Sequence, residues 1–478
     1  MKKTILSLLL LNLAFSPLYG QSEQIFATTD KQSAEKLLKE FPSEVSILKT
    51  HGNSAAIQVT QNAANYLHEF VDTHGPGYVY KSSENAAVAA IQKVAANKSV
   101  LNFTITEEAW VNAAINQVSE ENIKNHIQVL ENYGTRKHNT QKAQDAANDL
   151  KTKWESWITA SGRSDISVRL VDHTGTPMPS VILTIDGATE PDDYVIVGGH
   201  LDSTSWSSQA PGADDDASGI ATISEMIRVL LESNFKPSKT VEFMAFAAEE
   251  IGLVGSNEIA EEYASENKNV LAFVQFDMTN YKGSSKDVYL ATDTYVSSDL
   301  NVFLVELMEH YNASGSHIFT YGNTICNYGC SDHYSWAEFG YNAAFPFEAT
   351  FNDSNPYIHS TQDKLVNMGN NAEHATKFAK LGLEFIIEAA KSTESLAVKS
   401  AENSSSNIFT SGKNLYYDFK ESSAAQLQII DSSGRIVVEQ KLLLNKGNTN
   451  LQTLKKGMYV AVFKMKNGKV QSKKFLIE

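Results

Sequence analysis

Residues 193–203 read DYVIVGGHLDS, a short run of β-branched and aromatic residues that ends in a histidine and an aspartate. Such a run predicts a buried strand. Two later runs end in the same way: KTVEFMAFAAEE at 239–250 ends in two glutamates, and NVLAFVQFDMTN at 269–280 has an aspartate directly after its apolar part. Three strands that each end in a polar side chain of this kind suggest one common site.

Helical patterns separate these predicted strands. The segment 216–235 places Ile220, Ile223, Ile227 and Leu230 at helical spacing. Strands that alternate with helices predict an α/β fold with a mainly parallel sheet. Ligands bind such a sheet at the carboxyl ends of its strands, so we expect the polar side chains to meet there.

These side chains are typical of a metal site. The candidates are His200, Asp202, Asp214, Asp215, Asp216, Glu249, Glu250, Asp277, His359 and Asp363. Two imidazoles with carboxylates and no thiolate suit Zn²⁺, with Mn²⁺ or Co²⁺ as alternatives. So many candidates favour two ions bridged by a carboxylate and a water, and such a bridging hydroxide is a nucleophile. One of the adjacent glutamates could then bind metal while the other acts as general base.

Length, charge and the first residues limit the possible functions. The chain has 478 residues, enough for about three domains, and a net charge of −16 that argues against nucleic acid and anionic membranes as partners. Residues 1–20 combine a lysine pair, an apolar core and small residues, as a secretory signal peptide does. We find no later apolar run long enough to span a membrane. We therefore expect a protein secreted to the cell exterior or the outer-membrane surface.

Cys326 and Cys330 are the two cysteines of the chain, and they close a very small loop. In a cytosolic protein such a pair could be a redox or metal element. Export to an oxidising compartment favours a disulfide instead.

Composition divides the rest of the chain. We expect a small α/β propeptide at 21–100, with an ordinary accessory domain as the alternative, a catalytic domain at 101–395 and a serine-rich linker at 396–406. Residues 407–478 alternate strand-like runs with turn signals and predict a β-sandwich. Residues 403–478 hold 12 basic and 5 acidic residues, a net charge of +7, which leaves −23 for the preceding chain. This tail resembles the C-terminal sorting domain that type IX secretion machinery recognises, which implies that machinery as a partner.

Six motifs between Phe103 and Ala390 carry a second resemblance. They are GGHLDS, PGADDDASG, AAEEIGLVGS, DMTNYKG, CNYGCSDH and NPYIHSTQD. In this order they resemble the co-catalytic zinc aminopeptidases of peptidase family M28, specifically the bacterial leucyl aminopeptidases of Vibrio type. The resemblance implies a three-layer α/β sandwich with a mainly parallel mixed sheet, the zinc exopeptidase fold. It also implies a hydrolase that removes the first residue of peptides with a free N-terminus and an apolar first side chain.

The resemblance assigns the metal ligands. His200 and Asp277 would bind one zinc ion, Glu250 and His359 the other, and Asp215 would bridge the two. The weaker candidates Asp214, His333 and Asp363 are not included among the ligands.

It also assigns the supporting roles. Glu249 would be the general base for the bridging water, and Asp202 would orient the ring of His200. A cis peptide bond would join Asp215 to Asp216, and Tyr328 would contact the tetrahedral intermediate. The two cysteines would form the family's disulfide.

An apolar pocket would hold the first side chain of the substrate. Its expected residues are Met278, Phe345, Phe347, Phe351 and Ile358. Ala291 and Ser354 stand where the Vibrio pattern has larger residues, so we hypothesise a roomier pocket. We expect a monomer.

Three alternatives stay open. A glutaminyl cyclase uses a related scaffold with one zinc, so metal stoichiometry separates it from a two-zinc aminopeptidase. A carboxypeptidase would need a cation for the substrate carboxylate, and no arginine lies in these motifs. A non-catalytic binding module would be favoured by loss of a ligand or of the base, but none is missing.

Overall fold

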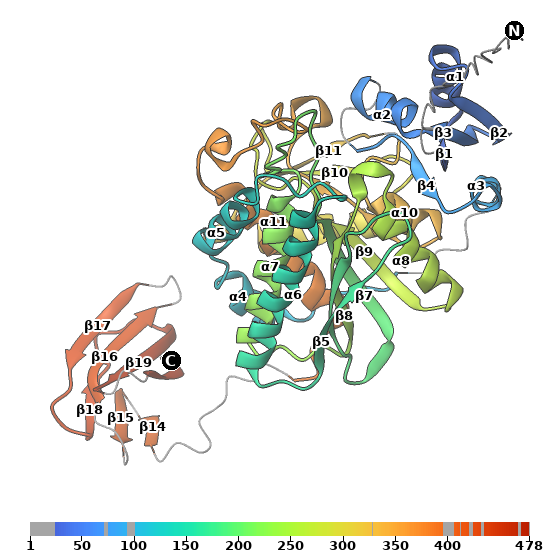
Figure 1. Ribbon diagram of the computed structural model, residues 1–478. Coiled ribbons are helices and arrows are strands. Elements are labelled where there is room, and N and C mark those ends of the chain that lie inside the picture. The colour runs from blue at the N-terminus through green and yellow to red at the C-terminus, as the bar shows by residue number, and fades with distance from the viewer. Residues whose placement is uncertain are drawn as a thin grey trace, which may run out of the picture. The chain divides into compact units, whose positions relative to one another are not determined.

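The computed structural model describes residues 24–70, 75–92, 101–326, 328–394, 406–411, 413–419, 424–431, 435–466 and 470–477. The chain divides into two compact units, Met1–Ser395 and Leu396–Glu478 (Figure 1). The predicted signal peptide at 1–20 and most of the predicted linker lie outside the described residues. No helix among the described residues is long and apolar enough to cross a membrane.

A six-stranded mixed sheet forms the centre of the first unit, with the order β12-β9-β7-β8-β6-β5. The strands are β5 (Ile166–Val171), β6 (Ser180–Ile185), β7 (Glu190–His200), β8 (Lys239–Phe246), β9 (Asn269–Gln275) and β12 (Ala343–Ala344). Strands β12, β9, β7 and β8 run parallel, and β6 and β5 continue the sheet antiparallel. The predicted mainly parallel α/β sheet is confirmed.

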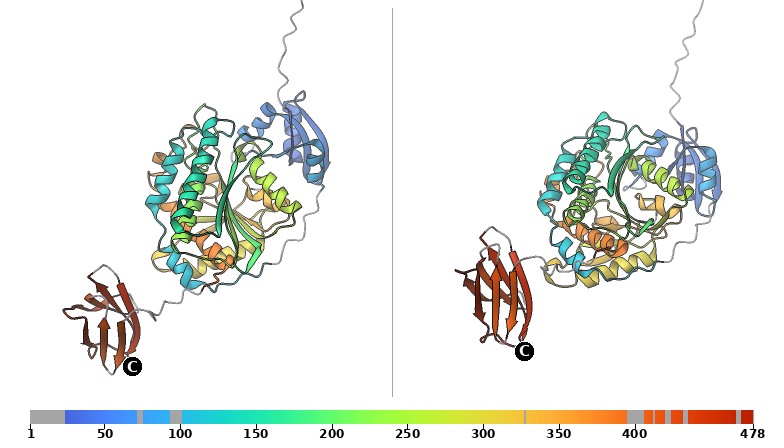
Figure 2. Two further views of the ribbon diagram at one scale, coloured as in Figure 1. Left: turned by 60° about the horizontal axis from the view of Figure 1, so that its bottom comes forward. Right: turned by 90° about the horizontal axis from the view of Figure 1, so that it is seen from below.

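Helices cover both faces of this sheet (Figure 2). Side chains of β7 alternate between the faces, since Val195 and Val197 join the larger apolar core and Ile196 joins the smaller one. The helices of the larger core are α4 (Glu108–Ile115), α5 (Glu120–Glu131), α6 (Gln141–Ser161), α7 (Ala217–Glu232), α9 (Ser298–Tyr311) and α11 (Glu373–Ala390). Those of the smaller core are α8 (Val254–Ser265) and α10 (His333–Glu338). The result is the predicted three-layer sandwich.

Helix α7 shows why the sequence pattern predicts this packing. The predicted stripe of isoleucine and leucine side chains is fully buried, with each member 0% exposed. The Asp216 carboxylate caps the helix, because it accepts the N–H of Gly219.

Short elements complete the catalytic region. A second sheet has the order β11-β10-β13, with β10 (Val288–Ala291), β11 (Tyr321–Thr324) and β13 (Pro346–Phe347). Four 3₁₀ turns are η1 (Glu249–Ile251), η2 (Gly315–His317), η3 (Phe351–Asp353) and η4 (Leu365–Met368).

The N-terminal part of the first unit is a small α/β element. Its antiparallel sheet has the order β2-β3-β1-β4. The elements are β1 (Gln24–Asp30), α1 (Lys31–Glu40), β2 (Val45–His51), β3 (Ser54–Thr60), α2 (Gln61–Phe70), β4 (Val79–Lys81) and α3 (Glu84–Ala90). The βαββαβα order matches the small α/β architecture expected here.

The second unit contains two antiparallel sheets, β14-β15-β18 and β17-β16-β19-β20. Their strands are β14 (Ser406–Ser411), β15 (Asn414–Phe419), β16 (Ala424–Asp431), β17 (Ile436–Lys441), β18 (Lys446–Asn450), β19 (Gly457–Met465) and β20 (Val470–Ile477). A separate apolar core that includes Phe419 of β15, Leu427 of β16 and Phe463 of β19 joins strands of the two sheets. The strand-rich C-terminal domain is confirmed.

Candidate metal centre

The carboxyl ends of two neighbouring parallel strands, with Asp215 from the loop before α7, bring the first candidate ligands together. Strand β7 ends at His200, and β9 ends two residues before Asp277. The His200 Nε2 atom lies 3.0 Å from Asp215 Oδ1 and 3.5 Å from Asp277 Oδ1. These three buried side chains can direct one nitrogen and two oxygens at a single cation.

A second group shares Asp215 with the first. The other oxygen of that carboxylate, Oδ2, lies 3.0 Å from His359 Nε2, which is 3.3 Å from Glu250 Oε2. In each group the ligand atoms lie within 4.8 Å of one another. Asp215 therefore offers one oxygen to each of two adjacent clusters, which is the arrangement of a bridging carboxylate.

Burial and like charges shift the pKa values of these groups. Burial raises the pKa of Glu249 well above its usual range, and burial beside Asp215 raises the pKa of Glu250 to about 7. Burial alone would lower the pKa of His359, because it disfavours the charged imidazolium. The neighbouring carboxylates of Glu250 and Asp215 outweigh this effect and raise the pKa of His359 to about 10. So many carboxyl groups in a buried site require positive charge nearby.

A cation fits this need. Asp277 Oδ1 and Glu249 Oε1 are buried and have no hydrogen-bond partner among the described residues. Native structures seldom leave such atoms unsatisfied. Because each cluster combines one imidazole with two carboxylates, the donor set suits zinc.

Three further aspartates tie the ligand-bearing segments together through main-chain N–H groups. Asp202 accepts the N–H groups of Glu249 at 3.0 Å and Glu250 at 3.3 Å. The same carboxylate lies 3.5 Å from His200 Nδ1, the ring that it was expected to orient. Asp202 therefore also connects β7 to the turn that follows β8.

Asp363 and Asp216 act in the same way on other segments. Asp363 accepts the N–H groups of Asp214 at 3.0 Å and Asp215 at 3.1 Å. Asp216 accepts the N–H of His200 at 3.0 Å, and that of Met278, next to Asp277, at 3.2 Å. The peptide bond between Asp215 and Asp216 is cis, as the family pattern implies.

Arg136 is a supporting residue that the sequence analysis did not identify. Its side chain is fully buried and donates to the main-chain oxygens of Leu130, Leu201, Pro211 and Gly212. It therefore joins the segments that precede Asp202 and Asp214. No spacing in the sequence marks it, because it comes from the loop after α5 and from none of the six motifs.

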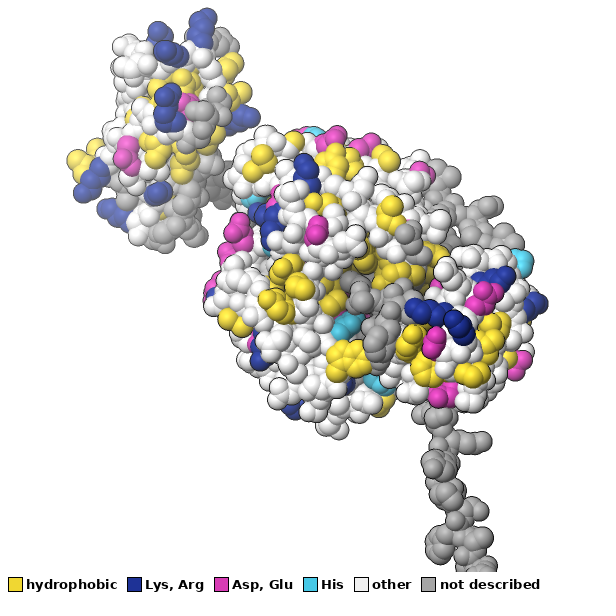
Figure 3. All heavy atoms as spheres, turned by 90° about the horizontal axis from the view of Figure 1, so that it is seen from above, with side chains coloured by type: hydrophobic (Ala, Val, Ile, Leu, Met, Phe, Trp, Pro, Cys, Tyr) yellow, Lys and Arg dark blue, Asp and Glu magenta, His cyan; other side chains and the backbone are white. Residues whose placement is uncertain are grey.

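A cavity of about 330 Å³ opens over the second ligand group. It is lined by Asp202, Glu250 and His359 from the catalytic region and by Gln61 and Asn65 from α2 of the N-terminal part. Figure 3 shows histidine and hydrophobic side chains together on the face of this unit seen from above. The N-terminal part thus contributes directly to the wall of the cavity.

The predicted apolar pocket residues also come together. Met278, Phe345 and Phe347 are fully buried, and Phe351 and Ile358 pack against them. Their cluster further contains Ala291, Val296 and the disulfide-bonded Cys326 and Cys330, and partly buried Tyr328 packs against it. The predicted disulfide is present.

Comparison with known proteins agrees with this site. Residues 180–383 match the model of peptidase family M28, and residues 411–478 match a secretion system C-terminal sorting domain. Leucine aminopeptidase 1 of Paracoccidioides brasiliensis is 32% identical over 317 residues, which are 63% of this chain and 79% of that protein. A probable aminopeptidase of Saccharomyces cerevisiae is 30% identical over 293 residues, 59% of this chain and 76% of that protein.

A solved structure extends the agreement to the fold. The LapA aminopeptidase of Legionella pneumophila superposes with a TM-score of 0.68 at 31% sequence identity and covers 78% of this chain and 100% of its own. LapB from the same organism gives a TM-score of 0.67 at 27% identity, covering 77% of this chain and 100% of its own. The chain therefore belongs to peptidase family M28 and is a zinc-dependent aminopeptidase with a C-terminal sorting domain.

Proposed function

We propose that this aminopeptidase uses two zinc ions, one held by His200 and Asp277 and one by Glu250 and His359, with Asp215 between them. The single observation that carries this proposal is the placement of the two Asp215 oxygens, each 3.0 Å from a different histidine Nε2 atom. Bound zinc would supply Lewis acid chemistry, which acidifies water and polarises a carbonyl group.

The chain's own side chains carry the proton transfers. Glu249 accepts a proton from the attacking water and passes it to the leaving amine. Its position supports this role, because Glu249 is buried and directly precedes Glu250 of the second ligand group. The free α-amino group of the substrate would lie among the carboxylates of one ligand group, and Tyr328 would contact the tetrahedral intermediate.

The substrate class is a peptide with a free N-terminus and an apolar first residue. The apolar cluster around Met278 and Phe347 adjoins the ligand Asp277 in the chain and supports this preference. Ala291 adds little volume to the cluster, which supports a pocket that accepts residues larger than leucine.

Export and processing complete the proposal. Residues 1–20 would direct export, and the type IX machinery would recognise the domain at 407–478 and deliver the protein to the exterior or the outer-membrane surface. The N-terminal part at 21–100 would be a propeptide. Gln61 and Asn65 in the cavity wall support this role, because α2 then covers the approach to Glu250 and His359.

The test is hydrolysis of Leu-p-nitroanilide by the purified chain, before and after chelation and with stepwise return of zinc. We expect loss of activity on chelation and full recovery near two zinc ions per chain. Glu249→Ala should lower turnover by about 10² to 10⁴. Full recovery of hydrolysis at one zinc per chain would reject the two-zinc mechanism. Full turnover in Glu249→Ala would reject the general base.

A further inference from the structure

A serine, a histidine and a glutamate outside the metal centre form a continuous hydrogen-bonded chain. His173 Nδ1 lies 2.9 Å from Glu258 Oε2, and His173 Nε2 lies 2.7 Å from Ser180 Oγ. The carboxylate can only accept, so Nδ1 donates to Glu258, and in the neutral ring Nε2 then accepts the hydroxyl proton of Ser180. Residues in this order also activate serine nucleophiles, which raises the question of what Ser180 does here.

Ser180 cannot reach a substrate in this structure. The residue is 0% exposed, and its Oγ accepts the main-chain N–H of Ala247 at 2.9 Å. A Cβ atom at Gly255 would lie 2.7 Å from the same Oγ, so the hydroxyl is enclosed between β8 and the start of α8. The hydrogen-bonded chain of Glu258, His173 and Ser180 therefore ends at the main-chain N–H of Ala247 and not at a substrate.

That peptide group begins the turn that carries Glu249. The Ala247 carbonyl accepts the N–H of Gly255 at 2.9 Å, and the Ala248 carbonyl accepts that of Val254 at 3.1 Å. Ala248 has a φ of 56°, a left-handed conformation that is unfavourable for alanine. Such a conformation persists only where the surrounding contacts determine it.

We propose that Ser180, His173 and Glu258 are positioning residues that hold the Ala247–Ala248 turn so that Glu249 meets the attacking water. This inference rests on the proposed role of Glu249 as general base. Asp202 fixes the far side of the same turn through the N–H groups of Glu249 and Glu250, so the hydrogen-bonded chain fixes its near side. Without Ser180 Oγ, the buried N–H of Ala247 would lose its acceptor, and the turn could relax away from the left-handed conformation.

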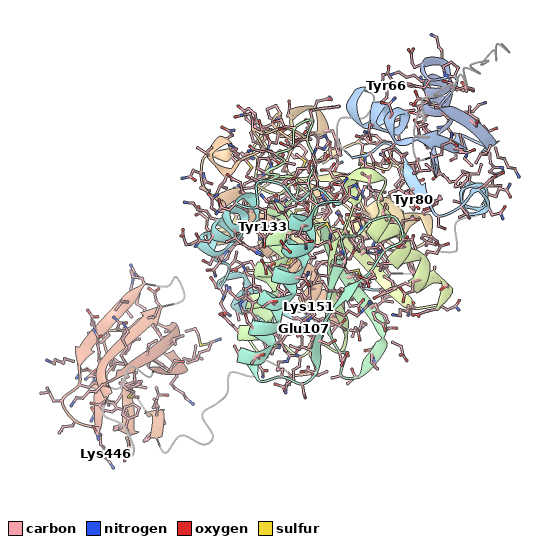
Figure 4. The ribbon with its side chains drawn as sticks, in the orientation of Figure 1. Tyr66, Tyr80, Glu107, Tyr133, Lys151 and Lys446 are labelled. Carbon is pink, nitrogen blue, oxygen red and sulfur yellow. A yellow bond between two sulfur atoms is a disulfide. The ribbon has the colours of Figure 1, made fainter. Side chains whose placement is uncertain are left out.

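The outer end of the chain lies near the surface. The Glu258 side chain is 27% exposed and also accepts the N–H of Thr174. Burial opposes its ionisation, yet the hydrogen bonds from His173 and Thr174 lower the pKa of Glu258. Glu258 shares a small cavity with Tyr80 of β4, and Figure 4 labels Tyr80 beside α8. A substitution of Glu258 can therefore interrupt the hydrogen-bonded chain without creating a cavity in the apolar core.

The experiment compares Ser180→Ala with Thr184→Val in the zinc-loaded full chain. Thr184 lies on the same strand and donates its hydroxyl to Glu242 of β8 at 2.9 Å, far from the turn, so it is a matched control. For Ser180→Ala we expect kcat on Leu-p-nitroanilide to fall about 10-fold, with KM changed by less than about twofold, because the turn is displaced and the substrate contacts are not. Thr184→Val should keep the wild-type kcat.

Two variants of Glu258 test the same proposal in case Ser180→Ala fails to fold. Glu258→Ala should lower kcat by about threefold or more, and Glu258→Gln, which keeps an acceptor for His173, should restore most of it. Equal kcat in Ser180→Ala and Thr184→Val, or equal values for the two Glu258 variants, would overturn the proposal. Glu249→Ala is measured alongside. If Glu249→Ala keeps full turnover, the proposed general base itself is wrong. If Glu249→Ala loses turnover while Glu258→Ala keeps the wild-type kcat, only the positioning role is rejected.

Discussion

Lys81→Met tests how the N-terminal part is held on the catalytic region. The Lys81 ammonium lies 2.8 and 3.0 Å from the two carboxylate oxygens of Glu338 and 2.9 Å from Asn257 Oδ1. The two charged side chains are only 6% and 9% exposed. Tyr80 adds a main-chain hydrogen bond to the oxygen of Gly252, in the turn after Glu249. The lysine therefore provides a buried charged contact that holds β4 on the catalytic region.

The magnitude follows from the burial of the pair. Removal of one partner leaves Glu338 as a buried unpaired carboxylate, which costs about 3 to 5 kcal/mol. At about 1.4 kcal/mol for each factor of ten, the equilibrium for docking of the N-terminal part should weaken by about two to three and a half orders of magnitude. If α2 covers the approach to the ligands, the uncleaved variant should be at least about 10-fold more active than the uncleaved wild type.

The assay measures Leu-p-nitroanilide hydrolysis by the uncleaved chain and again after limited proteolysis has removed the N-terminal part. Wild type and Lys81→Met should differ before cleavage and agree after it, because Lys81 is absent from the cleaved enzyme. Lys239→Met, at a partly exposed ion pair with Glu190 in the catalytic region, is the control. An uncleaved Lys81→Met chain that is no more active than wild type, beside a large activation of both by proteolysis, would refute this reasoning.

Three further predictions concern stability, specificity and metal. Burial lowers the pKa of His374 to about 4, so the unfolded chain binds the extra proton first and stability should fall by about 3 kcal/mol as pH drops from about 6.5 to about 4. In urea unfolding of the chelated proteins, wild type should lose this amount relative to His374→Gln over that pH range. Ala291→Ile should lower the ratio of Phe- to Leu-p-nitroanilide hydrolysis by about 10-fold, and an unchanged ratio would contradict the roomier pocket. Chelation should lower the free energy of unfolding by about 3 kcal/mol for each site that was filled at 100 times its Kd, and calorimetry with and without chelator measures this change.

The fold and the ligand groups were open to prediction because they depend on short-range patterns. Three apolar runs that end in acid or histidine identify strands whose ends share one edge, and helix α7 follows from its apolar stripe. The cis bond at Asp215 came instead from the order of the six motifs, and the disulfide from the expected export of a chain with two cysteines, since no periodicity indicates either.

Other features depend on tertiary contacts that a single sequence does not reveal. Arg136 donates to four main-chain oxygens. Every residue type has such an oxygen, so the sequence does not show which residues accept from Arg136. Asp363 resembles any aspartate in a polar loop until its two oxygens are seen on the N–H groups of Asp214 and Asp215. The contribution of Gln61 to the cavity wall was equally hidden, because α2 lies far from the ligands in the sequence.

The supporting aspartates explain how so many buried carboxyl groups can be held in place before a cation is present. Asp202, Asp216 and Asp363 each accept N–H groups from a segment that carries a proposed ligand, and each comes from a different segment. Main-chain dipoles that point at these carboxylates offset part of the cost of their burial without using a side-chain cation. The remaining excess charge lies on the ligands themselves. A divalent cation then binds to an arrangement that is already formed. Its binding free energy therefore comes from charge neutralisation and is not reduced by the cost of ordering the turns.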